Sequence, residues 1–306
     1  MVRAALMTRP RGAAVVLAML IAALAAVVAV AVTAEQQRWF SDVANRRDQV
    51  QAQALALAGV QWARQIMQDD ARNSTIDHLG EAWAFPLPRT PLENGSIEGA
   101  IEDAQGRLNI NNLATSDGLG KEEKARLARL FAQRGVSPRA LDGVTASVLA
   151  VPASNDVQTL GESPALQALP KGLRPMRAAE LASARGVSAS DITRILPYVV
   201  ALPAATVLNV NTAPPEVLAA ALQGLTGDAL AELVAARTSK PFATLADFRS
   251  RLPSGATIPN ETTLGVNSSY FLVSVRARQG DTQAQARALL RRDGREWPIV
   301  VWQIVE

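Results

Sequence analysis

The chain has 306 residues, 48% of them hydrophobic, and a formal net charge of +3. Arg3, Arg9 and Arg11 account for that charge, so residues 13–306 carry a formal net charge of 0 (3 − 3 = 0). A nucleic-acid-binding domain instead spreads Lys and Arg over a folded face, so the charge does not favour that class of protein. The chain has no cysteine and one histidine, His78, which excludes disulfides, thiolate or multi-histidine metal sites and cysteine nucleophiles. We expect His78 to be a surface or capping residue.

An uninterrupted apolar segment spans residues 13–34, which hold no charge, Gly or Pro and only one polar residue, Thr33. As a helix, a segment of this length reaches about 33 Å and matches a hydrocarbon core of about 30 Å. Arginines precede the segment and Glu35 follows it. The positive-inside rule therefore places the N-terminus in the cytoplasm and the rest of the chain across the membrane.

The residues around this segment allow three interpretations. One is a signal peptide cut after Ala34, although the apolar region of a signal peptide typically runs only about 7–15 residues. Another is a plain uncleaved anchor. The third, which we favour, rests on Pro10-Arg11-Gly12 directly before the apolar run, an arrangement that resembles the leader of type IV pilins and pseudopilins. The resemblance implies that a prepilin peptidase cuts between Gly12 and Ala13 and methylates the new N-terminus.

The predicted helix continues beyond the membrane to about residue 71, because Gly59 is the only helix breaker after Glu35. Apolar residues recur in steps of three, four and seven and predict one face of an amphipathic helix. They are Phe40, Val43, Val50, Ala54, Leu57, Ala58, Trp62, Ile66 and Met67. We expect this stripe, and Phe40, Val43, Val50 and Trp62 above all, to contact the folded head or the helices of partner subunits.

Short β-strands are predicted on both sides of a long helical region. Residues 97–103 and 108–110 form the first two, and residues 270–278, 282–290 and 297–305 form three more, separated by turn sequences. The middle one of these three is Ala-rich and alternates polar with small residues, as in a sheet with one covered face. A long helix that covers an antiparallel sheet predicts an α+β fold.

Residues 115–255 are rich in Ala and Leu with short breaks and predict helices. Two segments, residues 180–196 and 216–234, share a pattern of helix, Gly-hydrophobic turn and helix. Such hairpins resemble helix-hairpin-helix or SAM-like units, some of which bind DNA phosphates. Residues 206–236 hold Glu216, Asp228 and Glu232 but no Lys or Arg, so we interpret the hairpins as packing units and keep DNA binding as the alternative function.

Four segments together resemble the K-type minor pseudopilins of type II secretion systems. They are residues 58–63 (AGVQWA), 102–113 (EDAQGRLNINNL), 208–213 (LNVNTA) and 266–271 (VNSSYF). We expect Asn209 and Asn211 to bond their own backbone and Thr212 to cap the next helix. The resemblance implies a pilin-like fold with an inserted all-helical domain, at the tip of the filament that drives export of folded proteins across the outer membrane. It also implies I-, J- and H-type minor pseudopilins and the major pseudopilin as partners.

Leu17 supports the K type. Most pilin-like subunits carry a Glu at the fifth position of the mature chain, which pairs with the N-terminal amine of a neighbour. Counted from Ala13, that position is Leu17, and K-type subunits are the members that lack this Glu. An unpaired carboxylate in hydrocarbon is costly, so a subunit without such a neighbour is better off without it.

No cofactor or catalytic site is predicted. Some members of the family bind calcium through acidic motifs, but here the matching positions read VLAVP (residues 148–152) and GESP (residues 161–164). Asp156 and Glu162 offer too few carboxylates for six to eight oxygen ligands. Glu102-Asp103 is interpreted as a solvated strand end, and neither a nucleophile elbow nor a phosphate loop is present.

The predicted organisation follows the chain in five parts. Residues 1–12 form the leader and residues 13–34 the membrane half of the helix. Residues 35–114 hold the periplasmic helix and the first strands, 115–255 the inserted helical domain, and 256–306 the last strands. The protein is thus predicted to be a single-pass inner-membrane protein with its bulk in the periplasm.

Overall fold

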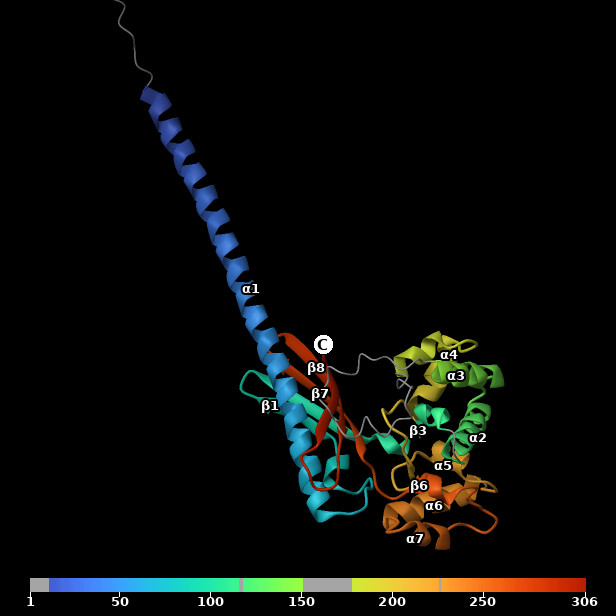
Figure 1. Ribbon diagram of the computed structural model, residues 1–306. Coiled ribbons are helices and arrows are strands. Elements are labelled where there is room, and N and C mark those ends of the chain that lie inside the picture. Colours follow the sequence, from blue (N-terminus) through green and yellow to red (C-terminus); the bar gives the residue numbers. More distant parts are fainter. Residues whose placement is uncertain (1–10, 116–117, 151–177, 226) are drawn as a thin grey trace, which may run out of the picture.

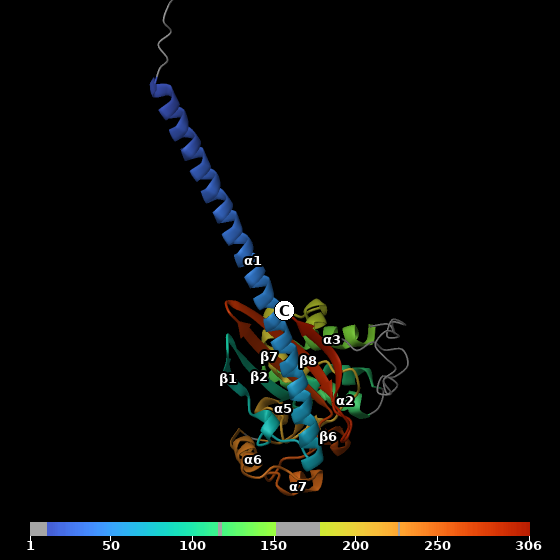
Figure 2. The same cartoon turned by 90° about the vertical axis from the view of Figure 1, so that its left-hand side faces the viewer.

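One long helix, α1 (Arg11–Asn73), dominates the computed structural model, which describes residues 11–115, 118–150, 178–225 and 227–306 (Figure 1). From residue 14 to residue 47 every residue except Ala34 is exposed, and only the last turns of this part, at Asp42, Asn45 and Arg46, come near the β7–β8 turn. The lower part of α1 lies along a sheet (Figure 2). The helix predicted from residue 13 to about residue 71 is confirmed.

The sheet has five antiparallel strands in the order β1-β2-β7-β8-β9. Their bounds are β1 (Leu87–Leu92), β2 (Gly95–Asp103), β7 (Tyr270–Gln279), β8 (Thr282–Arg291) and β9 (Ile299–Val305), and a short 3-10 helix, η1 (Ala82–Ala84), precedes them. The predicted strands at 97–103, 270–278, 282–290 and 297–305 are confirmed. The last begins two residues later than predicted, after Pro298.

Small side chains form the core between α1 and the sheet. The helix faces alternate residues of β7 and β8. The helix residues in this core are Ala52, Ala56, Val60, Ala63 and Met67. Those strand residues are Val273, Val275, Ala277, Ala284, Ala286 and Ala288. The alternation of buried and open positions is the period-2 pattern of a sheet with one covered face. We call α1 from residue 52 onward, η1 and the sheet the head.

The central pair of the sheet is formed by strands far apart in sequence. β2 pairs with β7 from Gly95↔Gln279 to Asp103↔Phe271, and residues 104–269 lie between the two strands in the chain. These residues leave the sheet at Asp103 and return to it at Tyr270. In Figure 1 the labelled helices of this segment lie on the far side of the sheet from α1.

Helices and very short strands make up the described part of this excursion, which we call the helical region. Its elements are η2 (Ala104–Gly106), β3 (Leu108–Asn109), η3 (Ile110–Ala114), α2 (Gly118–Gln133), α3 (Pro138–Ala150), η6 (Ala178–Ser183), α4 (Ala189–Ile195), η7 (Leu196–Tyr198), β4 (Val199–Val200), β5 (Leu208–Asn209), α5 (Pro215–Ala221), α6 (Gly227–Ser239), α7 (Leu245–Ser250), η8 (Glu261–Thr263) and β6 (Leu264–Gly265). A separate core unites them and includes Leu108, Ile110 and Leu264. That core thus extends past residues 115 and 255.

A repeat of the motif Leu-Asn-x-Asn organises the helical region. Residues 108–111 (LNIN) and 208–211 (LNVN) each begin with a two-residue strand in a parallel pair, β3 with β4 and β5 with β6. A helix, a glycine with positive φ and a second helix follow each copy. The glycines are Gly135 (φ 66°) and Gly224 (φ 72°), a backbone conformation that only glycine adopts readily.

This repeat corrects the predicted one. Residues 180–196 do hold the predicted turn, at Gly186 (φ 79°), and the helix α4 after it, but the element before the turn is the 3-10 helix η6 and not an α-helix. The structural counterpart of α5 and α6 is the pair α2 and α3.

Candidate assembly surface and polar junction

Gly12 and Ala13, the predicted processing site, lie in the first turn of α1, which begins at Arg11. The preceding leader, with Arg3, Arg9 and Pro10, lies outside the described residues. Cleavage between Gly12 and Ala13 stays a prediction.

The five residues of α1 predicted as its membrane and assembly surface are exposed, whereas Met67, at the end of the predicted apolar stripe, is buried against the sheet. The exposed fractions are 60% for Leu17, 63% for Phe40, 47% for Val43, 65% for Val50 and 50% for Trp62. We call these five residues the assembly stripe. Contact of the predicted stripe with the head is found for Met67 and for the partly buried Ile66, and contact of the assembly stripe with partner helices stays a prediction.

The head instead packs on the small-residue face of α1. The reason is the close approach of helix and sheet at Gly59, where an added Cβ would lie 2.6 Å from Val275 Cγ1. A helix this close to a sheet accommodates Gly and Ala better than Trp or Leu. The segment 58–63, part of the family resemblance, thus includes the point where α1 meets the sheet.

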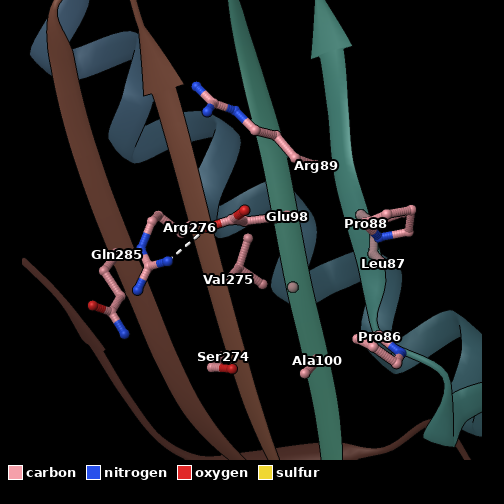
Figure 3. Close-up of a pocket in the computed structure, with 11 residues that line it drawn as sticks. Pro86, Leu87, Pro88, Arg89, Glu98, Ala100, Ser274, Val275, Arg276 and Gln285 are labelled. Atoms are coloured by element: carbon pink, nitrogen blue, oxygen red, sulfur yellow. Dashed lines mark hydrogen bonds and ion pairs between the residues drawn. The ribbon is translucent and has the colours of Figure 1, made fainter.

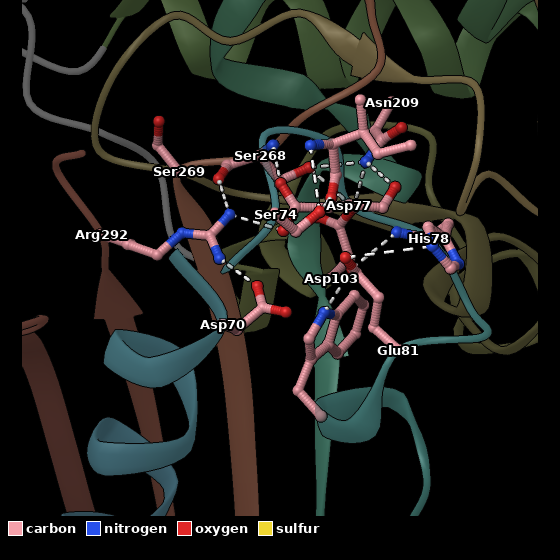
Figure 4. Close-up of polar contacts among 12 residues, drawn as sticks. Asp70, Ser74, Asp77, His78, Glu81, Asp103, Asn209, Ser268, Ser269 and Arg292 are labelled. Carbon is pink, nitrogen blue, oxygen red and sulfur yellow. Dashed lines mark hydrogen bonds and ion pairs between the residues drawn. The ribbon is translucent and has the colours of Figure 1, made fainter. Parts of the chain in front are cut away.

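A buried polar cluster joins the head to the helical region (Figure 4). We call it the polar junction, and its members come from four places: the end of α1 and the loop after it, the end of β2, the Leu-Asn-Val-Asn segment, and the two ends of the β7–β8 hairpin. They are Asp70, Asp77, Asp103, Gln105, Asn209, Thr212, Ser268 and Arg292. Three of the four segments that carry the family resemblance therefore meet here.

Asp103 is the acceptor at the centre of the polar junction. Its Oδ2 accepts hydrogen bonds from Thr212 Oγ1 (2.6 Å), Ser268 Oγ (2.7 Å) and Asn209 Nδ2 (2.9 Å). Its Oδ1 accepts one from the backbone N–H of Gln105 (2.8 Å). Burial raises the pKa of Asp103, and these four hydrogen bonds oppose the rise.

The interpretation of Glu102-Asp103 as a solvated strand end is therefore wrong for Asp103, which is only 7% exposed. It holds for Glu102, which is exposed and pairs with Arg107. Adjacent residues of a strand point to opposite faces. One carboxylate therefore enters the junction while the other faces water.

Arg292 binds two carboxylates at the other side of the junction. Its Nη1 donates to Asp70 Oδ2 (2.6 Å), and its Nη2 donates to Asp77 Oδ1 (2.5 Å) and to the Ser268 carbonyl (3.1 Å). Asp77 Oδ2 accepts the Ser268 N–H (2.6 Å). Burial raises the pKa of Asp77 to about 6, although Arg292 holds it down.

The asparagines of the Leu-Asn-Val-Asn segment have separate roles. Asn209 Oδ1 accepts the N–H of Asn211 (3.0 Å), as predicted for a side chain that bonds its own backbone. Asn211 instead exchanges hydrogen bonds with both backbone groups of Phe242. Thr212 does not cap the next helix: α5 begins at Pro215, and the Thr212 hydroxyl is bound to Asp103.

The carboxylates near the junction have protein partners, and the expectation of no metal stays a prediction. Oxygens of Asp70, Asp77 and Glu81 lie within 4.8 Å of one another. Arg292 binds the first two, and Glu81 accepts hydrogen bonds from Trp83 Nε1 and from the His78 N–H. His78 itself accepts the Gly80 N–H through Nδ1, so it is a turn-capping residue as expected. Asp156 and Glu162 lie outside the described residues.

A shallow pocket of about 280 Å³ lies on the sheet face away from α1 (Figure 3). Pro86, Leu87 and Pro88 of the β1 edge border it, and Arg276 binds Glu98 within it (2.6 Å). Ser274 is its only hydroxyl, and His78 is not among the lining residues. The pocket therefore pairs charges on an open sheet face and supplies no nucleophile with a base.

Comparison with known proteins places this geometry in a family. Family models described as type II secretion system protein K match residues 106–204 and 208–267. Type II secretion system protein K of Pectobacterium carotovorum subsp. carotovorum is 30% identical over 316 residues, which cover 96% of either chain. The chain belongs to the type II secretion system protein K family. The proteins of that name from Klebsiella pneumoniae (30% identical, 95% of either chain) and Pseudomonas aeruginosa (29% identical, 92% of this chain and 88% of the relative) are similar.

A solved structure shares the fold. A chain in the crystal structure of the GspK-GspI-GspJ complex from enterotoxigenic Escherichia coli has a TM-score of 0.69 and 22% identity, and the match covers 87% of this chain and 99% of that chain. The pilin-like α+β fold is thereby confirmed. The two family matches adjoin the polar junction: Gln105 directly precedes the first, Asn209 is the second residue of the other, and Ser268 directly follows it.

The chain is a minor pseudopilin of the type II secretion system, a structural part of secretion machinery that is anchored in a membrane. Among the described residues, α1 is long and apolar enough to cross a membrane. The family assignment favours this function over the DNA-binding alternative.

Proposed function

We propose that this protein K subunit starts or caps the pseudopilus at its tip. The observation that carries the proposal is the combination of an exposed α1 and a helical region that leaves the sheet between β2 and β7. A repeating subunit needs free space above and below its head, whereas the described part of the helical region adds bulk on the side of the sheet opposite α1. The absence of an acidic residue at Leu17 agrees with a subunit that has no neighbour to pair with.

The same proposal includes the topology. The N-terminus lies in the cytoplasm, the span crosses the inner membrane once, and the head and helical region lie in the periplasm. Prepilin peptidase cuts between Gly12 and Ala13 and methylates Ala13. Residues 115–255 act as an inserted helix-hairpin-helix or SAM-like domain, and no metal or cofactor takes part.

The partners are I- and J-type minor pseudopilins, with the H-type and major pseudopilins further along the filament. A likeness to a chain solved in complex with GspI and GspJ supports the first two. The assembly stripe is the surface that suits them, because a helix with an exposed apolar face packs against another such helix.

The deciding experiment is to quantify this subunit against the major pseudopilin in sheared filaments. A tip subunit gives about one copy per filament, independent of filament length. Abundance that grows in proportion to the major pseudopilin refutes the tip position, while membership of the secretion system would still stand.

A further inference from the structure

The two edges of the sheet are built differently. The β1 edge carries Pro88 and Pro91 within its six residues, and proline is a residue that blocks further strand pairing. The β9 edge reads IVVWQIV, with no proline and no charge. An apolar open edge of this kind is ordinarily covered, because it otherwise pairs with any extended chain.

The outer side of β9 offers a row of backbone groups. Glu306 and Gln285 exchange both of their backbone hydrogen bonds (2.8 and 2.9 Å), and the antiparallel register continues with Ile304 opposite Arg287. Bonded and non-bonded pairs alternate along such a ladder. The N–H and C=O groups of Gln303 and Val305 therefore point away from β8, where no described strand pairs with them.

Apolar side chains accompany this row. Ile304 is 53% exposed, and Trp302 and Ile299 are also exposed. Trp302 and Ile304 lie opposite Leu289 and Arg287, which alternate with the alanines buried under α1. The two side chains therefore stand on the sheet face away from the helix and are free to pack on the side chains of an added strand.

The edge is also continuous with α1. Arg64 Nε donates to the Pro298 carbonyl directly before β9 (2.8 Å), and the Arg64 guanidinium lies 5.0 Å from the centre of the Trp297 ring. A subunit that packs along α1 thus reaches the start of β9 without leaving the surface.

We propose that β9 pairs with the edge strand of a neighbouring pseudopilin subunit, so that one sheet continues across two subunits. This proposal rests on the proposed function, since the neighbour is the I- or J-type partner. The chemistry that β9 recognises is an extended segment with a free row of backbone groups and apolar side chains at alternate positions.

Photo-crosslinking of the full-length chain tests the pairing. Because the chain has no cysteine, a single introduced cysteine is the only position in it that takes up the label. Ile304→Cys, labelled with benzophenone maleimide and photolysed in membranes that also hold the I- and J-type subunits, should give an adduct with one of them. Leu92→Cys, on the β1 edge and also exposed, is the matched control and should give at least tenfold less. An adduct with a second copy of this chain or with an exported protein, or equal yields from both sites, overturns the proposal.

A backbone variant separates strand pairing from mere proximity. Gln303→Pro removes an outward N–H while leaving the bonds to β8, so the label at 304 should lose at least tenfold in adduct yield with little change in Tm. Gln303→Ala should retain the adduct. If Gln303→Pro unfolds the chain, Ile304→Lys replaces it as the test, because the side chain of Ile304 is exposed. Ile304→Lys should reduce the amount of partner subunit that co-purifies with the chain tenfold. Normal co-purification with either variant refutes the edge pairing alone, whereas failure of the unmodified chain to co-purify refutes the proposed function.

Discussion

Glu123 is a carboxylate that the fold holds in an unfavourable place. It lies in α2 at 1% exposure, its Oε1 has no hydrogen-bond partner among the described residues, and its Oε2 is 3.6 Å from Arg126 Nη1. Burial raises its pKa to about 7, although Arg126 holds it down. A group whose pKa is raised on folding binds more protons in the folded state between its unfolded and folded pKa values. Unfolding free energy therefore falls as pH rises from about 4.5 to about 7.

Glu123→Gln should remove this part of the pH dependence. The amide stays neutral at every pH, so at pH 8 the variant should have an unfolding free energy roughly 2 kcal/mol higher than the unmodified protein. This gain is smaller than the pKa shift of Glu123 implies, because the attraction between the carboxylate and Arg126 is lost. The stability difference is measured by thermal unfolding, monitored by circular dichroism, at pH values from 5 to 8. Asp77, whose pKa is about 6, keeps a residual slope in both proteins. Glu122→Gln is the control and should leave the slope in place; a Glu123→Gln protein that is less stable at pH 8 contradicts the prediction.

The residues of the polar junction show where sequence reasoning stops. Asp103 binds Thr212 and Ser268, which lie 109 and 165 positions further along the chain. Local patterns describe a strand end or a helix cap from its near neighbours, and they described Asn209 correctly on that basis. Nothing local distinguishes a Thr that caps from one that binds a distant carboxylate. The usable signal was that three of the family-like segments are rich in Asn, Ser and Asp, residues that rarely gather in buried places unless they bond one another.

At the scale of elements, the close contact between α1 and the sheet requires a residue without a side chain at position 59, which is Gly59. In an ordinary helix, replacing Gly by Ala stabilises by about 1 kcal/mol. Here the new Cβ would lie 2.6 Å from Val275 Cγ1 and 3.3 Å from Ile97 Cδ1. Gly59→Ala should therefore destabilise the protein, by about 1–3 kcal/mol from overpacking.

Thermal unfolding of the full chain in detergent checks the sign of this effect. Gly227→Ala is the matched control, because Gly227 begins α6 and an added Cβ there has no atom within 4 Å. That variant should be neutral or slightly stabilising. A Gly59→Ala protein with a raised Tm would show that helix and sheet are less closely packed than described.

The assembly stripe leads to a prediction about binding. Val43→Asp or Val50→Asp should leave the chain folded, since both side chains are exposed and neither belongs to the buried core of the head. Each should weaken assembly with I- and J-type subunits at least tenfold, because a partner helix would bury an unpaired charge. Co-purification from membranes is the measurement. Ser41→Asp is the control, because Ser41 is exposed and lies on the opposite side of the helix from Val43 and Val50 at about 100° per residue. It should have little effect, and an equal loss from Ser41→Asp would mean that any charge on α1 is harmful.

Periodicity predicted the elements better than their contacts. The alternating pattern identified the strands of the sheet, and the long apolar run identified α1. The same pattern left the large apolar residues of α1 to the head or to partner helices, and the head takes mainly the alanines together with Val60 and Met67. A helix with two usable faces, one of small and one of large residues, has no local feature that says which one meets the sheet. The Leu-Asn-x-Asn repeat at 108 and 208 was readable in the sequence but was obscured by the more evident Gly turns.

At the scale of the whole molecule, the predicted cleavage between Gly12 and Ala13 can be tested directly. N-terminal sequencing of the mature protein should begin at Ala13, and Gly12→Leu should leave the precursor uncut but inserted in the membrane. Secretion should then fail while the amount of membrane-bound chain stays unchanged. Ser41→Leu, well outside the leader, serves as the control and should be processed normally. A mature chain that begins at Glu35 would restore the signal-peptide interpretation.

The α+β architecture was predictable because its parts are local: one helix, short strands and a block of helices. The topology was predictable only in outline. That β2 pairs with β7 depends on residues 104–269 folding back to the same edge, and no local pattern encodes which strands meet across such a distance. The core of the helical region also takes Leu108 and Leu264 from segments that composition assigned to the sheet.

That central strand pair also dictates an order of events during biogenesis. The chain is synthesised from its N-terminus, so α1, β1 and β2 are made before the helical region, and β7 to β9 are made last. Until Tyr270 arrives, β2 has an unpaired edge and the alanine face of α1 has nothing to cover. Pairing partners so distant in sequence close slowly, because a long loop must be ordered first. A helical region that has already folded shortens that loop. The inserted helices thus act on the folding rate of the head: variants that unfold them should delay closure of the sheet and leave the subunit open to proteolysis while it waits.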